Sequence, residues 1–229
     1  YHNFIAKKAT DSATTGDQAN ASTTQSSDNK SAATNSQVTT PKIVSGSIDG
    51  SFGTSLSFEY PETWKYSQEI SGTIETDGAW VQSITIVSPS GKYTIQYTID
   101  AGGGLGGVCD PSSSGILASV AYESLVQFSS MSYVELLYKD AKTSEDLGSV
   151  TIPGFIGLMK SSKVSNTKAG NSRCDIYLAD IAILSEAKSV QLMGAKMLID
   201  GADTASGLKD SLNGAEYEQA KAILLSTKH

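Results

Sequence analysis

The residues with the most obvious potential for chemistry lie in a glycine-rich stretch, AGGGLGGVCDP, at positions 101–111. Gly102, Gly104 and Gly107 have the G-x-G-x-x-G spacing of a loop that binds the phosphates of a dinucleotide. Such a loop joins a buried strand to a helix, whose first N–H groups meet the pyrophosphate. Here the Val-Cys-Asp-Pro-Ser that follows cannot start a helix at once, and it holds no Lys-Ser or Lys-Thr pair. We therefore expect a sharp turn and no cofactor.

The two cysteines of the chain, Cys109 and Cys174, offer a second kind of chemistry. We expect them to form a disulfide, because the polar N-terminal segment described below is typical of proteins outside the cytoplasm, where thiols oxidise. A crosslink over so long a loop stabilises a fold by roughly 4 kcal/mol. The alternatives are two separate buried thiols or half of a metal site, and two cysteines without histidine are too few for a zinc centre.

Charged residues accompany both cysteines. Asp110 follows Cys109, while Arg173 and Asp175 flank Cys174, and Arg173 is the only arginine of the chain. A disulfide would bring these charges together beside the glycines, and arginine grips carboxylates and phosphates with two parallel hydrogen bonds. One hypothesis is an anionic ligand or partner; the other is that Arg173 pairs with Asp110 and supports the loop. The candidate binding residues are Gly103, Gly104, Asp110, Arg173 and Asp175.

Other catalytic arrangements are missing from the sequence. Both histidines, His2 and His229, stand at the ends of the chain, so no histidine triad or metal centre can form within a domain. S-x-x-K occurs at 165–168 and 206–209, but without the K-T-G that accompanies it in transpeptidases. Asp200-Gly-Ala-Asp203 lacks the ligand spacing of an EF-hand. We predict no catalytic residue, no metal and no cofactor.

The charge balance excludes some partners. The formal net charge is −7, and nucleic-acid binders need a basic stripe that releases counterions from phosphates. A basic amphipathic face for a membrane surface is missing for the same reason. The expected partner is an unidentified protein or small molecule.

The N-terminal segment predicts a tether. Residues 9–40 are rich in Ser, Thr, Ala and Asn, with Val38 as their one large apolar side chain, so they cannot offset the entropy of ordering and should be disordered. The FIAKK before them is interpreted as the stub of an anchor; the alternative is a cloning boundary. We expect 1–42 to be anchor stub and tether, membrane contact only through an anchor upstream of residue 1, and an extracytoplasmic place, surface-anchored or secreted.

Residues 43–229 have the patterns of a folded domain. Residues 80–100 predict a β-hairpin around Pro89-Ser90-Gly91, with Tyr93, Ile95, Tyr97 and Ile99 on its buried face. Residues 132–139, 151–162, 174–184 and 189–198 are typical of strands. Helical spacing marks 116–130, and Asn213 with Glu216 predicts a cap for a terminal helix. The expected fold class is α+β, an antiparallel sheet flanked by helices with the C-terminal helix packed on it.

The beginning and end of this domain resemble a known class. Phe58, Tyr60, Pro61 and Trp64 form an F-x-Y-P-x-x-W motif, and a long hairpin and a terminal EYEQAKAILLS helix follow it. This pattern is similar to PsbP/Mog1-like domains, including those of anchored, lipoprotein-like extracytoplasmic bacterial proteins. The class hosts unrelated roles, so the resemblance implies a fold and no functional residue.

Together these features favour a non-catalytic binding or interaction domain displayed from a bacterial membrane on a flexible tether. Two alternatives remain: the globular head of a pilin-like surface subunit, and an envelope enzyme with a carboxylate or Ser/Lys site.

Overall fold

The computed structural model describes residues 41–49, 55–71, 80–101, 115–139, 143–144, 150–151, 153–176, 182–183 and 191–229. All of them belong to the unit Thr40–His229. The predicted tether and the glycine-rich loop lie outside the described residues, so the division into 1–42 and 43–229 stays a prediction.

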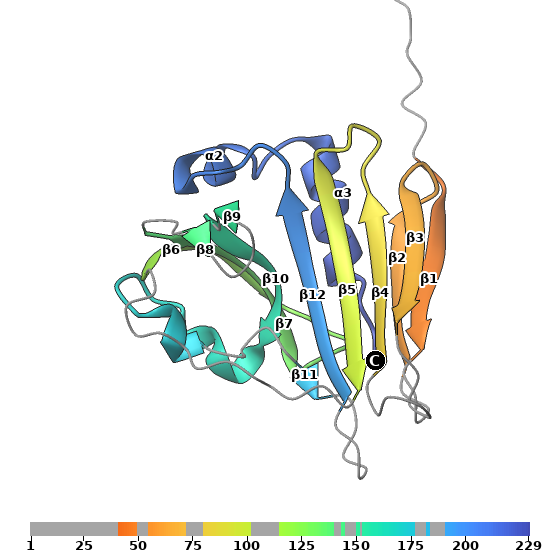
Figure 1. The fold of residues 1–229 in the computed structure, drawn as a ribbon, viewed down its shortest axis with the longest axis horizontal. Coiled ribbons are helices and arrows are strands. Elements are labelled where there is room, and N and C mark those ends of the chain that lie inside the picture. Colours follow the sequence, from red (N-terminus) through yellow and green to blue (C-terminus); the bar gives the residue numbers. More distant parts are fainter. Residues whose placement is uncertain are drawn as a thin grey trace, which may run out of the picture. The chain divides into compact units, whose positions relative to one another are not determined.

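Antiparallel sheets dominate this unit (Figure 1). The main sheet has the order β3-β4-β5-β12-β10-β7-β6, and β11 also pairs with β12; β1 pairs with β2, and β8 with β9. The bounds are β1 Ile43–Asp49, β2 Ser55–Pro61, β3 Lys65–Ser71, β4 Trp80–Val87, β5 Tyr93–Ala101, β6 Ile116–Ser124, β7 Met131–Tyr138, β8 Thr143–Ser144, β9 Val150–Thr151, β10 Gly154–Lys160, β11 Ala182–Ile183 and β12 Gln191–Ile199. The helices are α2 Ala205–Asp210 and α3 Ala215–Leu225, with the 3₁₀ turns η2 Ser161–Asn166 and η3 Arg173–Ile176.

The predicted α+β class is wrong, because the described residues are mainly β. The largest error is at 116–130, where the spacing predicts a helix and the chain instead forms strand β6 and a turn. Two register shifts against β7 leave Leu117 and Val120 without a paired residue. Such bulges break the two-residue period of a strand, and the irregular spacing that results imitates a helical stripe.

The predicted hairpin is confirmed. β4 and β5 pair from Trp80↔Ala101 to Val87↔Thr94, and Gly91 takes the positive φ of 80° that the turn requires. Tyr93, Ile95, Tyr97 and Ile99 are all buried on the core face of β5. The strands predicted from 132–139 and 189–198 also form, as β7 and β12.

The aromatic residues of 56–66 gather around a turn and do not follow one extended segment. Trp64 N–H donates to the carbonyl oxygen of Pro61, which reverses the chain between β2 and β3. Tyr60 and Tyr66 then stack at 5.7 Å, and Phe58 stacks on Tyr97 at 4.4 Å. The β1–β2 pair therefore shares the hydrophobic core of the main sheet.

The terminal helix forms, but it begins differently from the prediction. Gly214, with φ of 91°, occupies the cap position, and no side chain caps the helix. Asn213 instead donates to the carbonyl oxygen of Asp210, and the Glu216 carboxylate accepts bonds from the N–H and hydroxyl of Ser90. Helix α3 is thus tied to the β4–β5 turn.

β10 and β12 meet at one register position, Gly157↔Lys196. A Cβ atom on Gly157 would lie 2.3 Å from the carbonyl oxygen of Ala195, so only glycine fits this approach. Each strand is paired over its whole length on its other side, β10 with β7 and β12 with β5.

Replacing Gly157 should therefore weaken the fold. Gly157→Ala forces two backbones apart, and we expect the free energy of unfolding to fall by about 1–3 kcal/mol. Gly115→Ala is the matched control, because its Cβ would meet its nearest atom at 3.3 Å, and its effect should stay below about 1 kcal/mol. Urea unfolding followed by circular dichroism measures both. Equal effects of the two substitutions would contradict the close approach.

Candidate functional site

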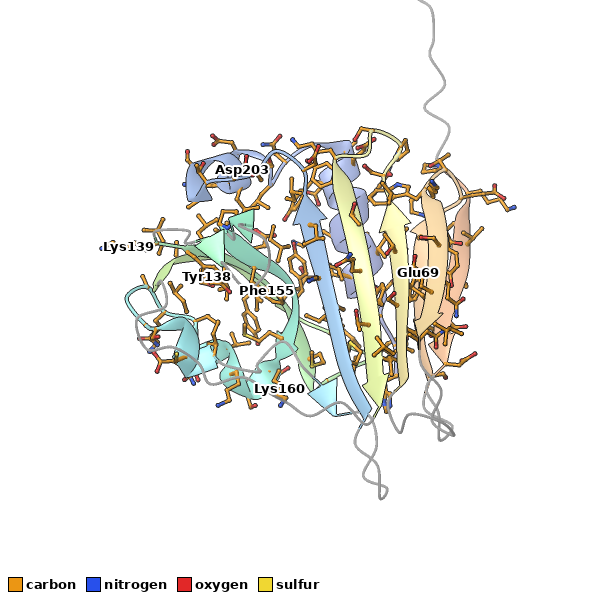
Figure 2. All side chains as sticks on the ribbon, in the orientation of Figure 1. Glu69, Tyr138, Lys139, Phe155, Lys160 and Asp203 are labelled. Carbon is orange, nitrogen blue, oxygen red and sulfur yellow. The ribbon has the colours of Figure 1, made fainter. Side chains whose placement is uncertain are left out.

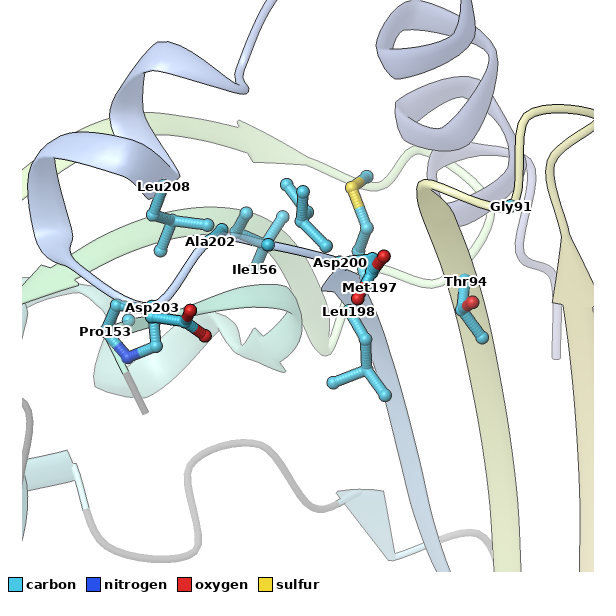
Figure 3. Close-up of a pocket in the computed structure, with 13 residues that line it drawn as sticks. Gly91, Thr94, Pro153, Ile156, Met197, Leu198, Asp200, Ala202, Asp203 and Leu208 are labelled. Carbon is cyan, nitrogen blue, oxygen red and sulfur yellow. The ribbon is translucent and has the colours of Figure 1, made fainter. Parts of the chain in front are cut away.

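A groove of about 480 Å³ lies at the end of β12, beside the first residues of β10 (Figure 3). Three buried apolar side chains, Ile156, Met197 and Leu208, line it from β10, β12 and α2. Pro153 and Gly154 lie on one side and Thr94 on the other, with the 200–203 loop between β12 and α2.

The groove exists because one edge of β12 is only partly occupied. On that side, β11 pairs with Leu192 and Met193, and β10 pairs with Lys196. Beyond Lys196 no described strand pairs with this edge, although β5 stays paired with the opposite edge as far as Ile199. The end of β12, from the Met197 carbonyl to Ile199, therefore faces the groove without a paired strand among the described residues.

The 200–203 loop and α2 close the end of the groove. Gly201 takes a positive φ of 72°, which turns the chain away from β12. The Thr204 hydroxyl accepts a hydrogen bond from Gly207 N–H at 3.0 Å and caps α2. Because α2 begins directly after this cap, Leu208 is its fourth residue and lines the groove.

The direction of the backbone groups follows from the ladders. Asp200 N–H donates to the carbonyl oxygen of Lys92, in register with the β5–β12 pairing. Because bonded and non-bonded pairs alternate in an antiparallel ladder, the N–H and C=O groups of Met197 and Ile199 point away from β5. By the same alternation, the Gly157↔Lys196 pairing joins the Met197 N–H to the Ile156 carbonyl of β10. The Met197 carbonyl and the Ile199 groups are therefore the ones that point toward the groove. Among the described residues, the Ile199 carbonyl oxygen accepts one bond outside the ladders, a long one from Ala202 N–H at 3.4 Å.

β10 presents its own backbone to the same space. Tyr138 N–H donates to the carbonyl oxygen of Pro153, in register with the β7–β10 pairing. By the same alternation, the peptide groups of Gly154 and Ile156 point away from β7, toward β12. Two strand edges therefore face each other across the groove.

The rim of the groove is acidic. Asp200 and Asp203 are exposed, and the described lining contains no lysine or arginine. Asp203 lies beside α2, at the end of the sheet toward which β12 runs (Figure 2). The site thus combines apolar side chains, free backbone groups and two carboxylates, a set that suits an apolar ligand carrying a cation.

A second polar cluster is buried between β7 and α3. Tyr133 donates to Glu135 Oε1 at 2.8 Å, and the Tyr217 hydroxyl donates to the same oxygen. Burial raises the pKa of both phenols, so both stay protonated and can donate. The Lys221 ammonium lies 5.3 Å from the centre of the Tyr133 ring. None of these residues lines the groove, and we interpret the cluster as the polar connection that fixes α3 to the sheet.

Most of the residues predicted as a site lie outside the described residues, namely Gly103, Gly104, Cys109 and Asp110. Arg173 begins η3, but its side chain is not among those described. The Asp175 carboxylate accepts a bond from Ser172 N–H at 2.8 Å, which holds this turn together. Cys174 is not a free thiol. The bond to Cys109 and the charge cluster around it stay predictions, and neither Cys174 nor Asp175 is part of the described groove lining.

Sequence reasoning missed the groove. The sequence contains only weak signals of this groove. Two glycines within strand β10, at 154 and 157, indicate a close approach of two backbones. The spacing of Asp200 and Asp203 matches no ligand motif. Among the described residues, no cluster of acidic, histidine or cysteine side chains could hold a metal ion.

Comparison with known proteins adds no assignment: no family model, curated protein or solved structure matches the chain. The resemblance to PsbP/Mog1-like domains therefore stays a prediction. Within the described ranges, no helix is long and apolar enough to cross a membrane.

Alkaline pH should weaken this fold. Tyr97 and Tyr133 are fully buried, and burial raises the pKa of both phenols above the usual value of about 10. The unfolded chain loses these protons near pH 10 while the folded chain keeps them. The free energy of unfolding is thus unaffected below about pH 10 and falls above it, by about 1.4 kcal/mol per pH unit for each tyrosine.

Urea unfolding at about pH 8 and about pH 11 tests this dependence. Tyr97→Phe should reduce the loss at high pH, whereas Tyr122→Phe, at a side chain that is 53% exposed, should leave it unchanged. A free energy of unfolding that stays constant between the two pH values would contradict the burial of these phenols.

Proposed function

We propose that this protein is a non-catalytic binding domain, displayed outside a bacterial membrane on its polar N-terminal segment, and that its ligand occupies the groove beside β12. The observation that carries the proposal is the open section of the β12 edge, with apolar side chains beneath it and Asp200 and Asp203 at its rim. The membrane tether and the extracytoplasmic place are supported by the sequence of residues 9–40.

Binding is favoured over catalysis by the composition of the described groove lining. It contains the Thr94 hydroxyl and two exposed carboxylates, but no histidine, cysteine or lysine that would activate a nucleophile. The buried carboxylate of Glu135 lies outside the groove and is already bonded to two tyrosine hydroxyls. No described feature favours the envelope enzyme or the pilin-like head over the binding domain.

The ligand should have an apolar part and a positive charge. Burial of apolar surface against Ile156, Met197 and Leu208 would contribute about 25 cal/mol per Å². Asp200 and Asp203 would select a cation at the solvent-exposed rim, where a charge pair adds about 0.2–1 kcal/mol. The formal net charge of −7 would also attract cations over a longer range.

Hexylamine, hexanoate and hexanol are suitable probes of this proposal, because they share one apolar chain and differ in charge. In ¹H–¹⁵N NMR titrations, hexylamine should shift the amide signals of residues 197–203 saturably, and hexanoate should bind more weakly than hexanol. The Asp200→Asn/Asp203→Asn double variant should weaken hexylamine binding about two- to fivefold.

Asp49→Asn is the control for the loss of a carboxylate outside the groove, because Asp49 is exposed on β1 and is not part of the groove lining. It should leave binding unchanged. If none of the three probes shifts the groove amides, or if hexanoate binds as tightly as hexylamine, the proposed site is wrong.

A further inference from the structure

We infer that the natural ligand is an extended peptide segment, which adds to the open edge of β12 between the Met197 carbonyl and Ile199 as an antiparallel strand and places a basic side chain at Asp200 and Asp203. This inference rests on the proposed function and specifies the ligand class of the same groove.

The first support is the direction of the β12 backbone. The ladder with β5 turns the Met197 carbonyl and both peptide groups of Ile199 toward the groove, while the Met197 N–H is used in the pairing with β10. At Ile199 no described strand pairs with these groups, and its carbonyl oxygen has only the 3.4 Å bond from Ala202. Strand edges of this kind are what a peptide recognises when it adds to a sheet.

The second support is that the chain already uses the same edge in this way. β11, only two residues long, pairs antiparallel with β12 at Leu192 and Met193. β10 occupies the next position, at Lys196. From the Met197 carbonyl to Ile199, no described strand pairs with this edge, and a peptide strand there would continue the pattern.

The size and side chains of the groove define the peptide. Three residues of strand span about 10 Å, and a volume of about 480 Å³ lies within the usual range for a ligand site. Side chains alternate between the two faces of a strand. One apolar side chain would therefore enter toward Ile156, Met197 and Leu208, and its neighbours would point outward.

The rim then favours basic neighbours. Met197 belongs to the face of β12 that packs on the core. Leu198 and Asp200 are two residues apart and therefore share the opposite face, which is exposed. An outward-pointing lysine or arginine next to the apolar residue would approach Asp200 and Asp203. The predicted recognition pattern is basic–apolar–basic in an extended segment.

The test compares three fluorescein-labelled peptide amides by anisotropy with the full chain: Lys-Val-Lys-Ala, the same peptide with an N-methylated valine, and Glu-Val-Glu-Ala. N-methylation removes a ladder donor and blocks close pairing, while it leaves the charges unchanged. We expect the first peptide to bind at least tenfold more tightly than either of the others. The Asp200→Asn/Asp203→Asn double variant should weaken binding of the first peptide, and Asp49→Asn should not.

The outcomes separate the two proposals. If hexylamine shifts the groove amides but the unmodified peptide binds no better than its N-methylated form, strand addition is wrong and the proposed site survives. Strand addition is equally wrong if hexylamine binds and the unmodified peptide does not. If hexylamine shifts no groove amide and no peptide binds in the anisotropy assay, both the proposed function and the peptide ligand are wrong.

Discussion

β10 and β12 approach closely at Gly157, where the missing side chain allows the contact, and they separate on either side of it. A Cβ atom on residue 157 would lie 2.3 Å from the Ala195 carbonyl oxygen, and the described parts of the two strands make their one ladder contact at this glycine. Each is bound along its whole length by its other neighbour, β7 or β5. Since each strand follows a different partner away from the contact, the sheet opens. The groove is the direct consequence of this opening.

The walls of the groove are held by the buried core. β7, which carries β10, is buried on both faces, and the Glu135 carboxylate joins it to Tyr217 of α3. On the other wall, β12 is paired with the confirmed β4–β5 hairpin, whose turn is bonded to Glu216 of α3. A strand edge held on both sides in this way is prepared for a partner, because little conformational entropy remains to be lost on binding.

Local patterns were sufficient for part of this fold. The alternation of Tyr93 to Ile99 predicted the hairpin face, and the buried residues of α3 have the helical spacing seen in the sequence. Local patterns failed in β6, because the bulges at Leu117 and Val120 disturb the two-residue period of the strand. The helix predicted there was part of the α+β class, which was therefore also wrong. The groove could not be predicted, since it depends on which strands become neighbours: β10 and β12 are joined by a contact between residues 157 and 196, and nothing local specifies that contact.

Intermolecular NOEs test the central claim most directly. In a complex of isotope-labelled protein with the unlabelled Lys-Val-Lys-Ala peptide, the Ile199 amide proton should show NOEs to peptide backbone protons, and the Leu208 methyl groups should show NOEs to the peptide valine. These contacts would place the peptide as a strand on the open edge of β12. NOEs from the bound peptide to the exposed strand β6, at Leu117 and Val120, with none to Ile199 or Leu208, would contradict the account.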